Sequence, residues 1–186
     1  MSQLIECVPN FSEGRDAAVI ERLAEVIRSS DGVRLLNVDP GKATNRTVYT
    51  FVGEPAAVVE AAFKAIREAS ELIDMRLHHG EHPRFGATDV CPLVPVSGIS
   101  MEDTVKWAHQ LARRVGEELG IPVYNYEYAA SSEERRSLAY CRSDEYEGLR
   151  DKLAQPQWKP DFGPAEWSDR VARTGATAIG ARNFLV

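Results

Sequence analysis

The apolar residues of the first 73 positions follow two periods, one typical of strands and one typical of helices. Short apolar runs with alternating faces predict strands, and apolar residues spaced three and four apart predict amphipathic helices. Gly32 suits the left-handed residue that ends a first helix, and Pro55 suits the first turn of a second. The predicted elements are strands at 4–8, 33–38 and 46–52 and helices at 15–29 and 55–73. The chain therefore begins in the order β-α-β-β-α.

The remaining residues first continue this alternation and then lose it. We expect a strand at 90–96, a helix at 101–119, a strand at 121–126 and shorter helices from 131 and over 144–153. Residues 176–186 are expected to form a final strand pair or a strand that begins a further unit. The first six elements, β-α-β-β-α-β, predict an α+β fold of the ferredoxin-like type. Such a fold has a mixed, mostly antiparallel sheet with helices packed on one face. The later, C-terminal helices would be additions to this unit.

Composition and charge narrow the class of protein. At 186 residues, with 44% hydrophobic and 27% charged residues, the chain resembles a globular protein that can bury a core. A formal net charge of −6 disfavours nucleic acid or an anionic membrane as the main partner. No apolar run approaches the ~20 residues of a membrane helix, and the N-terminus lacks the pattern of a signal peptide. The three widely spaced cysteines are expected to be reduced thiols, as in a cytoplasmic protein.

Three of the four histidines lie in one segment, 76–95, together with arginines, acids, glycines and prolines. Glycine and proline break regular structure, so we expect a loop here, anchored by the strand that follows. A histidine titrates near neutrality and can both accept and donate a proton. His82, with charged neighbours on both sides, is therefore the candidate general acid/base. On spacing alone, an ordinary solvent-exposed loop histidine stays open as the alternative.

The same histidines raise the question of a metal site. His78 and His82 have the i, i+4 separation of a helical zinc pair. Gly80 and Pro83 disfavour a helix at this point. Glu81 also adjoins the second histidine, whereas the H-E-x-x-H pattern places the acid after the first. We therefore expect no metal.

A polar, turn-rich loop is expected at 39–45, between two adjacent strands. Asp39, Asn45 and Arg46 flank it and are suited to hydrogen-bond a ligand, with Arg46 able to pair a carboxylate through two parallel bonds. Ordinary turn chemistry with a surface salt bridge is the alternative, and local sequence alone favours that alternative. The chain contains no glycine-rich phosphate loop of either common type.

Two features near the end of the chain have no assigned role. The segment 155–163 is rich in Pro and Trp, and it would either cover a sheet edge or form one wall of a pocket for a flat heterocycle. The run 184–186 is apolar and strand-like, with no polar tail after it. From it we expect a boundary inside a longer protein.

Several long stretches, in the same order, resemble the formiminotransferase family, and the likeness covers nearly the whole chain. They are residues 6–14 (ECVPNFSEG), 44–53 (TNRTVYTFVG), 80–84 (GEHPR), 89–92 (DVCP), 160–164 (PDFGP) and 180–185 (GARNFL). The resemblance implies an N-terminal subdomain over residues 1–180. It also implies that 181–186 begin the hinge to a C-terminal subdomain.

The resemblance implies the activity of a glutamate formimidoyltransferase, a one-carbon transferase of histidine degradation. Such enzymes move the formimino group of N-formimino-L-glutamate to N5 of tetrahydrofolate, which is a co-substrate, and they use no metal. The family's catalytic histidine corresponds to His82. Its folate-binding stretch corresponds to Gly163, Pro164, Ala165, Glu166 and Trp167. From their residue types, the expected substrate-binding residues are Asp39, Asn45, Arg46, Glu81 and Arg84.

The family's folate pocket is completed by a second subdomain. We therefore expect a C-terminal subdomain or a partner chain, together with assembly into a homodimer or larger oligomer. Two alternatives to the transferase interpretation stay open. One is transfer of a formyl group in place of the formimino group. The other is a non-catalytic module that binds folate or an acidic small molecule, or that serves as an assembly subunit.

Overall fold

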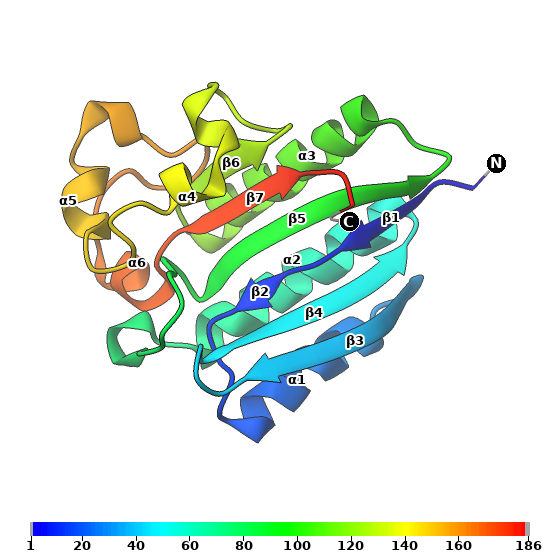
Figure 1. Ribbon diagram of the computed structural model, residues 1–186, viewed down its shortest axis with the longest axis horizontal. Coiled ribbons are helices and arrows are strands. Elements are labelled where there is room, and N and C mark those ends of the chain that lie inside the picture. Colours follow the sequence, from blue (N-terminus) through cyan, green and yellow to red (C-terminus); the bar gives the residue numbers. More distant parts are fainter. Residues whose placement is uncertain (1, 185–186) are drawn as a thin grey trace.

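Seven strands form one mixed sheet, and three long helices lie side by side on one of its faces (Figure 1). The computed structural model describes residues 2–184. The strands are β1 (Leu4–Cys7), β2 (Asn10–Phe11), β3 (Val33–Gly41), β4 (Arg46–Gly53), β5 (Thr88–Ser97), β6 (Val123–Glu127) and β7 (Thr177–Ala181). The helices are α1 (Ala17–Arg28), α2 (Pro55–Leu72), α3 (Met101–Leu119), α4 (Leu138–Cys141), α5 (Leu149–Leu153) and α6 (Asp169–Thr174), with 3-10 turns η1 (Met75–Leu77), η2 (Glu134–Arg136) and η3 (Pro156–Trp158).

Strands β1 and β2 share one position in the sheet. Both pair with β4 on one side and with β5 on the other, all antiparallel. The two pieces are separated at Pro9, which has no N–H to donate, although its carbonyl still accepts a 3.0 Å hydrogen bond from the amide of Tyr49. The order across the sheet is therefore β3, β4, β1 with β2, β5, β7, β6.

The last three strands of that order are parallel to one another. β7 comes last in the sequence but inserts between β5 and β6, and all five of its residues are buried. A parallel strand covered on both faces is expected to be apolar or small at every position, and TAIGA fits this. β7 thereby joins the segment that precedes it, residues 128–176, to the middle of the sheet.

The predicted α+β class, with a mixed sheet and helices on one face, is confirmed. The first elements follow the expected order β-α-β-β-α-β, and their long strands lie side by side as β3, β4, β1 and β5. Strands β6 and β7 extend the sheet beyond this unit. The predicted helix 101–119 matches α3 at both ends. At its N-terminal end, the Ser100 side chain caps the helix by accepting a hydrogen bond from the amide of Asp103.

Three sequence predictions need correction. The strand expected at 33–38 continues to Gly41, so Asp39 lies in the β3–β4 hairpin and not in a loop. The helix expected over 144–153 is confined to α5, because Asp144 and Glu145 take left-handed backbone angles, with φ of 68° and 56°. The strand pair expected at 176–186 is the single strand β7, and residues 185–186 of that range lie outside the described residues.

The two faces of the sheet are covered differently. Helices α1, α2 and α3 bury one face with the main apolar core, which includes Ile5, Phe51 and Leu93. On the other face, the segment 128–176 covers only β6, β7 and part of β5, around a second cluster built on Tyr124 and Trp158. The face over β1, β3 and β4 is left open toward the viewer in Figure 1.

All three cysteines are free and buried, as expected. Cys7 and Cys91 lie side by side in the main core, with their sulfur atoms 3.5 Å apart, and Cys141 belongs to the second cluster. Within residues 2–184, no helix combines the length and the apolar character needed to cross a membrane.

Candidate functional site

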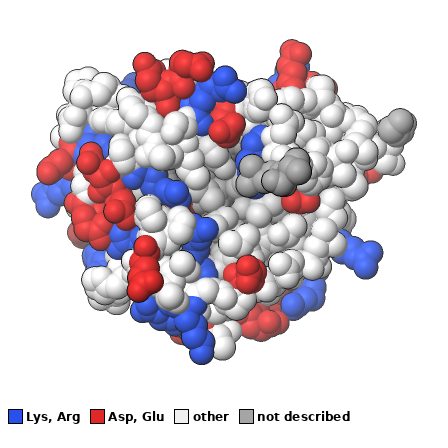
Figure 2. All heavy atoms as spheres, viewed as in Figure 1, with Lys and Arg blue, Asp and Glu red and all other residues white. Residues whose placement is uncertain are grey.

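A cavity of about 290 Å³ opens on the uncovered face of the sheet, where β2 and β5 meet the segment 128–176. Its polar lining consists of Asn10, Arg46, His82, Glu127, Arg142 and Arg182. Its apolar lining consists of Val90, Pro92, Tyr126 and Leu138. Figure 2 views this face: basic side chains border its middle, whereas the surface over β1 and β5 is largely uncharged. The cavity therefore combines an apolar floor with three cationic side chains.

His82 is half-buried in this cavity, and its two ring nitrogens have different partners. Nδ1 lies 2.7 Å from the carbonyl oxygen of Pro83, which can only accept, so Nδ1 carries the proton of the neutral ring. Nε2 then holds the lone pair, and it lies 2.9 Å from Nη1 of Arg46, which can only donate. In this tautomer the unprotonated nitrogen of His82 lies beside Arg46 in the cavity.

Arg46 is the first residue of β4, and the sheet fixes its main chain opposite Gly41. Its Nη1 lies 2.8 Å from Nδ1 of His82 as well as 2.9 Å from Nε2, so one guanidinium nitrogen faces both ring nitrogens. Burial lowers the pKa of Arg46, and the nearby carboxylate of Asp89 opposes that shift. An arginine at this position stays charged and is available to an anion that enters the cavity.

Arg142 reaches the cavity from the C-terminal end of α4. Its Nη1 donates to Asp89 across 2.6 Å, and the Asp89 side chain has no exposed surface. Burial raises the pKa of Asp89, while Arg142 and the amide of Phe85, at 2.8 Å, act in the other direction. A buried carboxylate therefore orients Arg142, and the remaining guanidinium donors are left for the cavity.

Glu127 and Arg182 complete the polar lining at the ends of two parallel strands. Glu127 ends β6, pairs with Ala181 and has a left-handed φ of 52°. A non-glycine residue in this region is strained by about 1 kcal/mol or more, and such residues gather at functional sites. Glu127 is the one acidic residue in the lining of this cavity among residues 2–184.

The loop that carries His82 is held at both ends by buried side chains. Arg84 donates from Nε to Nδ1 of His78 at 3.0 Å, and His78 donates from Nε2 to the carbonyl of Asn45 at 2.8 Å. Asn45 in turn donates to the carbonyl of His79 at 3.0 Å and accepts from the amide of Gly14 at 2.9 Å. The carbonyl of Asn45 precedes Arg46 directly, so one network fixes both the loop and the start of β4.

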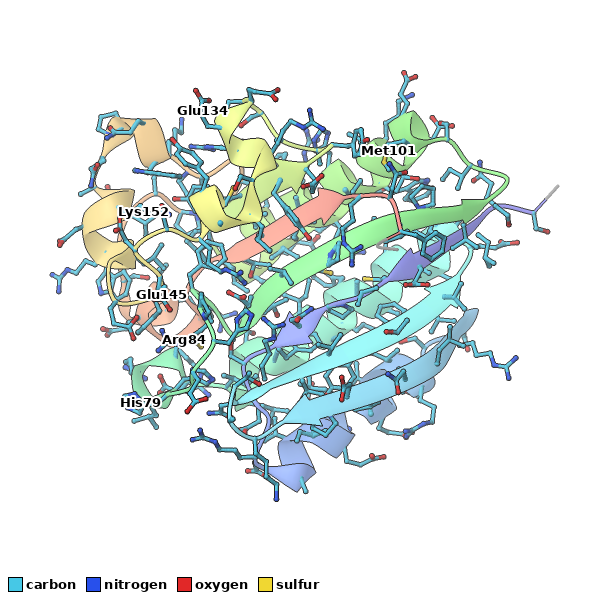
Figure 3. The ribbon with its side chains drawn as sticks, viewed as in Figure 1. His79, Arg84, Met101, Glu134, Glu145 and Lys152 are labelled. Carbon is cyan, nitrogen blue, oxygen red and sulfur yellow. The ribbon has the colours of Figure 1, made fainter. Side chains whose placement is uncertain are left out.

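Arg84 also joins this loop to the segment after α4. Its guanidinium makes two parallel 2.8 Å hydrogen bonds to Glu147, and its carbonyl accepts from the amide of Tyr146 at 2.9 Å. Figure 3 shows Arg84 and Glu145 facing each other between the two segments, with His79 at the outer end of the loop. The salt bridge between Arg84 and Glu145 is long, at 3.8 Å.

Of the residues proposed from sequence, only Arg46 and His82 meet in the cavity. Arg84 and Asn45 are buried and hold the loop in place. Glu81 is exposed, with its amide bonded to the carbonyl of Ala43 at 3.1 Å. Asp39 is also exposed and lies on the open face of the sheet. It occupies the same cross-strand row as Asn10, two strands away, with Val48 of β4 between them.

The stretch proposed for folate binding lies apart from this cavity, because none of its residues is in the lining. Gly163 has a φ of 86° and packs so closely on Gly116 of α3 and on Ile121 that a Cβ would not fit. Trp167 packs against Tyr146, with ring centroids 6.1 Å apart. Pro164, Ala165 and Glu166 are partly or fully exposed between them.

Sequence reasoning missed Arg142, Arg182 and Glu127. Arg182 lies within a stretch that resembled the family but was interpreted as a hinge. Arg142 and Glu127 carried no local signal, because only the order of the strands brings them to the cavity. Within the described part of the chain, no group of three or more His, Cys, Asp and Glu side chains is placed to hold a metal ion.

Chemically, the cavity suits a small molecule with carboxylates. Arg46, Arg142 and Arg182 offer guanidinium donors for anions, and Glu127 offers an acceptor for a cation. Between them, His82 offers Nε2, a ring nitrogen that has no main-chain partner and lies beside Arg46. A site with these parts can bind a dicarboxylate and move a proton on it.

Comparison with known proteins shows the family of the chain. Residues 4–182 match the model of the formiminotransferase domain, N-terminal subdomain. The chain is 57% identical over 186 residues to a formimidoyltransferase-cyclodeaminase of Gallus gallus and 51% identical to one of Dictyostelium discoideum, covering all of this chain and 34% of each of those proteins. It is 49% identical over 185 residues to a glutamate formimidoyltransferase of Thermoplasma acidophilum, covering 98% of this chain and 60% of that protein. The chain thus spans between about a third and three fifths of the length of these relatives.

Proposed function

Because the chain belongs to the formiminotransferase family, as its N-terminal subdomain, we propose that it supplies the catalytic histidine for formimino transfer. The donor would be N-formimino-L-glutamate and the acceptor N5 of tetrahydrofolate, as a co-substrate. The observation that carries the proposal is the pairing of His82 and Arg46 in one cavity, where Nε2 of His82 lies 2.9 Å from Nη1 of Arg46 and Nδ1 lies 2.7 Å from the carbonyl oxygen of Pro83.

The proposed reaction begins when a carboxylate of the donor pairs with Arg46. This draws the guanidinium away from Nε2 of His82 and leaves that nitrogen free to act as a base. N5 of tetrahydrofolate then attacks the formimino carbon, and its proton passes to Nε2. The tetrahedral adduct collapses as Nε2 returns the proton to the glutamate nitrogen and the old C–N bond breaks. One histidine can serve both steps because imidazole accepts and donates protons near neutrality.

Charge supports this choice of donor. N-formimino-L-glutamate carries two carboxylates and, when protonated, one amidinium. In the proposal, the carboxylates pair with the guanidinium groups of Arg46, Arg182 and Arg142. Glu127 then faces the amidinium, and its negative charge favours the protonated form of the formimino group, which is the form that N5 attacks. Asp39, on the same open face, is the second acidic candidate for that contact.

The acceptor would lie between this subdomain and a second one. The open face beside the cavity carries exposed apolar side chains, Leu36 on β3 and Val96 on β5 among them. Such a surface is suited to be covered by a C-terminal subdomain or partner chain. Residues 163–167 would contact folate only from outside the cavity described above. The free edge of β3 offers a further surface for association of two or more copies. We propose a cytoplasmic setting, since all three cysteines are free thiols.

The test is substitution of His82 by Gln, assayed with the C-terminal subdomain supplied. We expect kcat for formimino transfer to fall by about 100-fold or more, while the affinity for N-formimino-L-glutamate, measured by calorimetry, changes little. His79→Gln is the matched control, because His79 is an exposed histidine of the same loop.

Each other outcome has a definite meaning. Equal loss of binding and rate in His82→Gln would assign this site to a non-catalytic binding module. Full activity in His82→Gln would exclude His82 as the acid/base. Turnover of N-formyl-L-glutamate in preference to the formimino donor would assign formyl transfer.

A further inference from the structure

Lys152 is a buried cation that lies outside the cavity described above. The residue is 1% exposed, although it belongs to the short surface helix α5 (Figure 3). Its Nζ lies 3.9 Å from the ring centroid of Trp158 and 5.8 Å from that of Tyr124. Burial lowers the pKa of Lys152 to about 8, so the site is costly for an ammonium group. A methionine would fill the same space without that cost.

The hydrogen bonds of this ammonium converge on one short segment. Nζ donates to the carbonyl of Cys141 at 2.6 Å and to the carbonyl of Ser143 at 2.8 Å. A third, longer contact of 3.4 Å joins Nζ to Oγ of Ser143. The two carbonyls belong to the residues directly before and after Arg142. The main chain is therefore held on both sides of that arginine by a single buried cation.

The segment needs such support because of its backbone. Asp144 and Glu145 follow directly, and both take left-handed angles that side-chain-bearing residues seldom adopt. At the other end of Arg142, the guanidinium is held by Asp89, which is also fully buried. Arg142 is thus fixed between a buried cation at its main chain and a buried anion at its tip.

We infer that Lys152 is a positioning residue for Arg142, and that it acts on ligand binding only through that arginine. The inference rests on the proposed function, since it takes Arg142 to pair with a carboxylate of N-formimino-L-glutamate. Arg142 presents a planar fork, and such a fork binds a carboxylate well only when its position is fixed. Release of the two carbonyls frees the main chain of Arg142 to move, and donor affinity falls.

The test is a double-mutant cycle on kcat/KM for N-formimino-L-glutamate, with the C-terminal subdomain supplied. The variants are Lys152→Met, Arg142→Gln and the double substitution. Glutamine at 142 can still donate to Asp89. We expect Lys152→Met alone to lower kcat/KM about tenfold, mainly through KM. In the Arg142→Gln background, we expect Lys152→Met to have no further effect.

Lys159→Met is the matched control, because it removes an exposed lysine of the same segment and changes the net charge equally. We expect it to leave kcat/KM unchanged. Thermal unfolding shows whether each variant is folded. If Lys152→Met does not fold, Lys152→Gln replaces it in the same cycle, since its amide is neutral and still carries donors.

Several results would overturn the inference. An unchanged kcat/KM in Lys152→Met would do so, as would an equal loss with and without Arg142, because the two residues would then act independently. A loss in Lys159→Met of the same size would assign the effect to net charge. If the unmodified protein does not turn over the donor, the proposed function falls and this inference falls with it. Turnover with an additive cycle overturns the inference alone.

Discussion

Nδ1 of His82 has a partner that Nε2 lacks, the carbonyl oxygen of Pro83, and this asymmetry underlies the proposed chemistry. The carbonyl of Pro83 holds the proton on Nδ1, and Arg46 covers the lone pair of Nε2 until a carboxylate competes for it. In the proposed reaction, the pair couples binding of an anion to release of a base. Arg46 can both cover Nε2 and pair with an anion because it lies in β4, which faces the loop that carries His82.

His78 gives a prediction about pH. Burial lowers its pKa below the usual 6.5, and its neutral ring accepts from Arg84. In the unfolded chain His78 takes up a proton more readily than in the folded one. Its contribution to stability is therefore full above about pH 6.5 and is lost as the pH falls through the lower folded-state pKa. We expect thermal stability to drop in this acidic range.

His78→Gln isolates that contribution. Glutamine does not titrate, but its amide can donate to the carbonyl of Asn45 while its oxygen accepts from Arg84. The difference in unfolding midpoint between the unmodified chain and His78→Gln should change sharply between pH 7.5 and pH 5. The contributions of other acid-sensitive groups are the same in both proteins and cancel in this difference. A difference that stays constant over this range would refute the role of His78.

Glu127 gives a prediction about the choice of donor. An amidinium makes a charge-assisted hydrogen bond to a carboxylate, whereas a formyl group offers no cation. Glu127→Gln should therefore lower kcat/KM for N-formimino-L-glutamate about tenfold and change the value for N-formyl-L-glutamate much less. The measurement is the ratio of the two values in each protein.

The control for Glu127 is Asp39→Asn, which removes another acid of the open face. If the donor ratio shifts in Asp39→Asn and not in Glu127→Gln, the amidinium contact belongs to Asp39. An unchanged ratio in both variants would mean that neither of these two carboxylates recognises the amidinium.

Local sequence could identify some of these residues but not others. His82 and Arg46 stood out because each lies beside residues of unusual composition, in a loop or at its end. Arg84 looked like a ligand-binding residue, yet it is 6% exposed and paired with Glu147, 63 positions later in the chain. A salt bridge between such distant residues leaves no trace in local spacing. The same holds for Arg142, which reaches the cavity through its buried partner Asp89.

At the scale of elements, the site is made from two irregular segments held on a regular sheet. The histidine loop and the segment after α4 are joined by Arg84, and each is fixed to the sheet by buried hydrogen bonds. Irregular backbone of this kind holds its shape only if its polar groups are satisfied. The site therefore depends on close contacts of the backbone around the loop.

Gly86, at the end of the histidine loop, tests that dependence. It lies against Gly175, and its carbonyl accepts from Ser12 at 2.7 Å. A Cβ there would clash with the carbonyl oxygen of Ala176. Gly86→Ala should therefore lower the free energy of unfolding by about 2 kcal/mol or more and also reduce turnover.

Gly120→Ala is the comparison for Gly86→Ala. Nothing lies within 4 Å of a Cβ at Gly120, so only its left-handed φ of 67° opposes the change, at a cost of about 1 kcal/mol. Chemical denaturation gives both values. Equal destabilisation of the two variants would show that the contact of Gly86 with Ala176 has little weight.

The regular elements were predicted well because periodicity and caps are local. α3 was placed to the residue by the Ser100 cap and by Gly120, whose left-handed angle ends it. β7 could not be placed, because its position between β5 and β6 is a long-range choice. The helix expected at 144–153 was wrong in its first half, where the chain turns back toward Arg84 and two left-handed residues replace a helical turn.

At the scale of the molecule, the sheet separates a structural face from a binding face. The helices α1, α2 and α3 cover one side completely, while the C-terminal segment covers only part of the other. The cavity lies at the border between covered and open sheet, where a ligand can touch both an apolar floor and charged walls. This placement is consistent with a second subdomain that closes over the open part.

The most direct test of this account is nitrogen-15 NMR of the histidine rings, with the C-terminal subdomain supplied. His82→Gln identifies the His82 signals among those of the four histidines. In the free protein we predict that the singly protonated His82 ring carries its proton on Nδ1. Saturating N-formimino-L-glutamate should shift Nε2 of His82, as Arg46 turns to the carboxylate, and leave His109 unchanged. A His82 ring that does not respond to a donor that the same sample turns over would contradict the account, because transfer would then occur elsewhere.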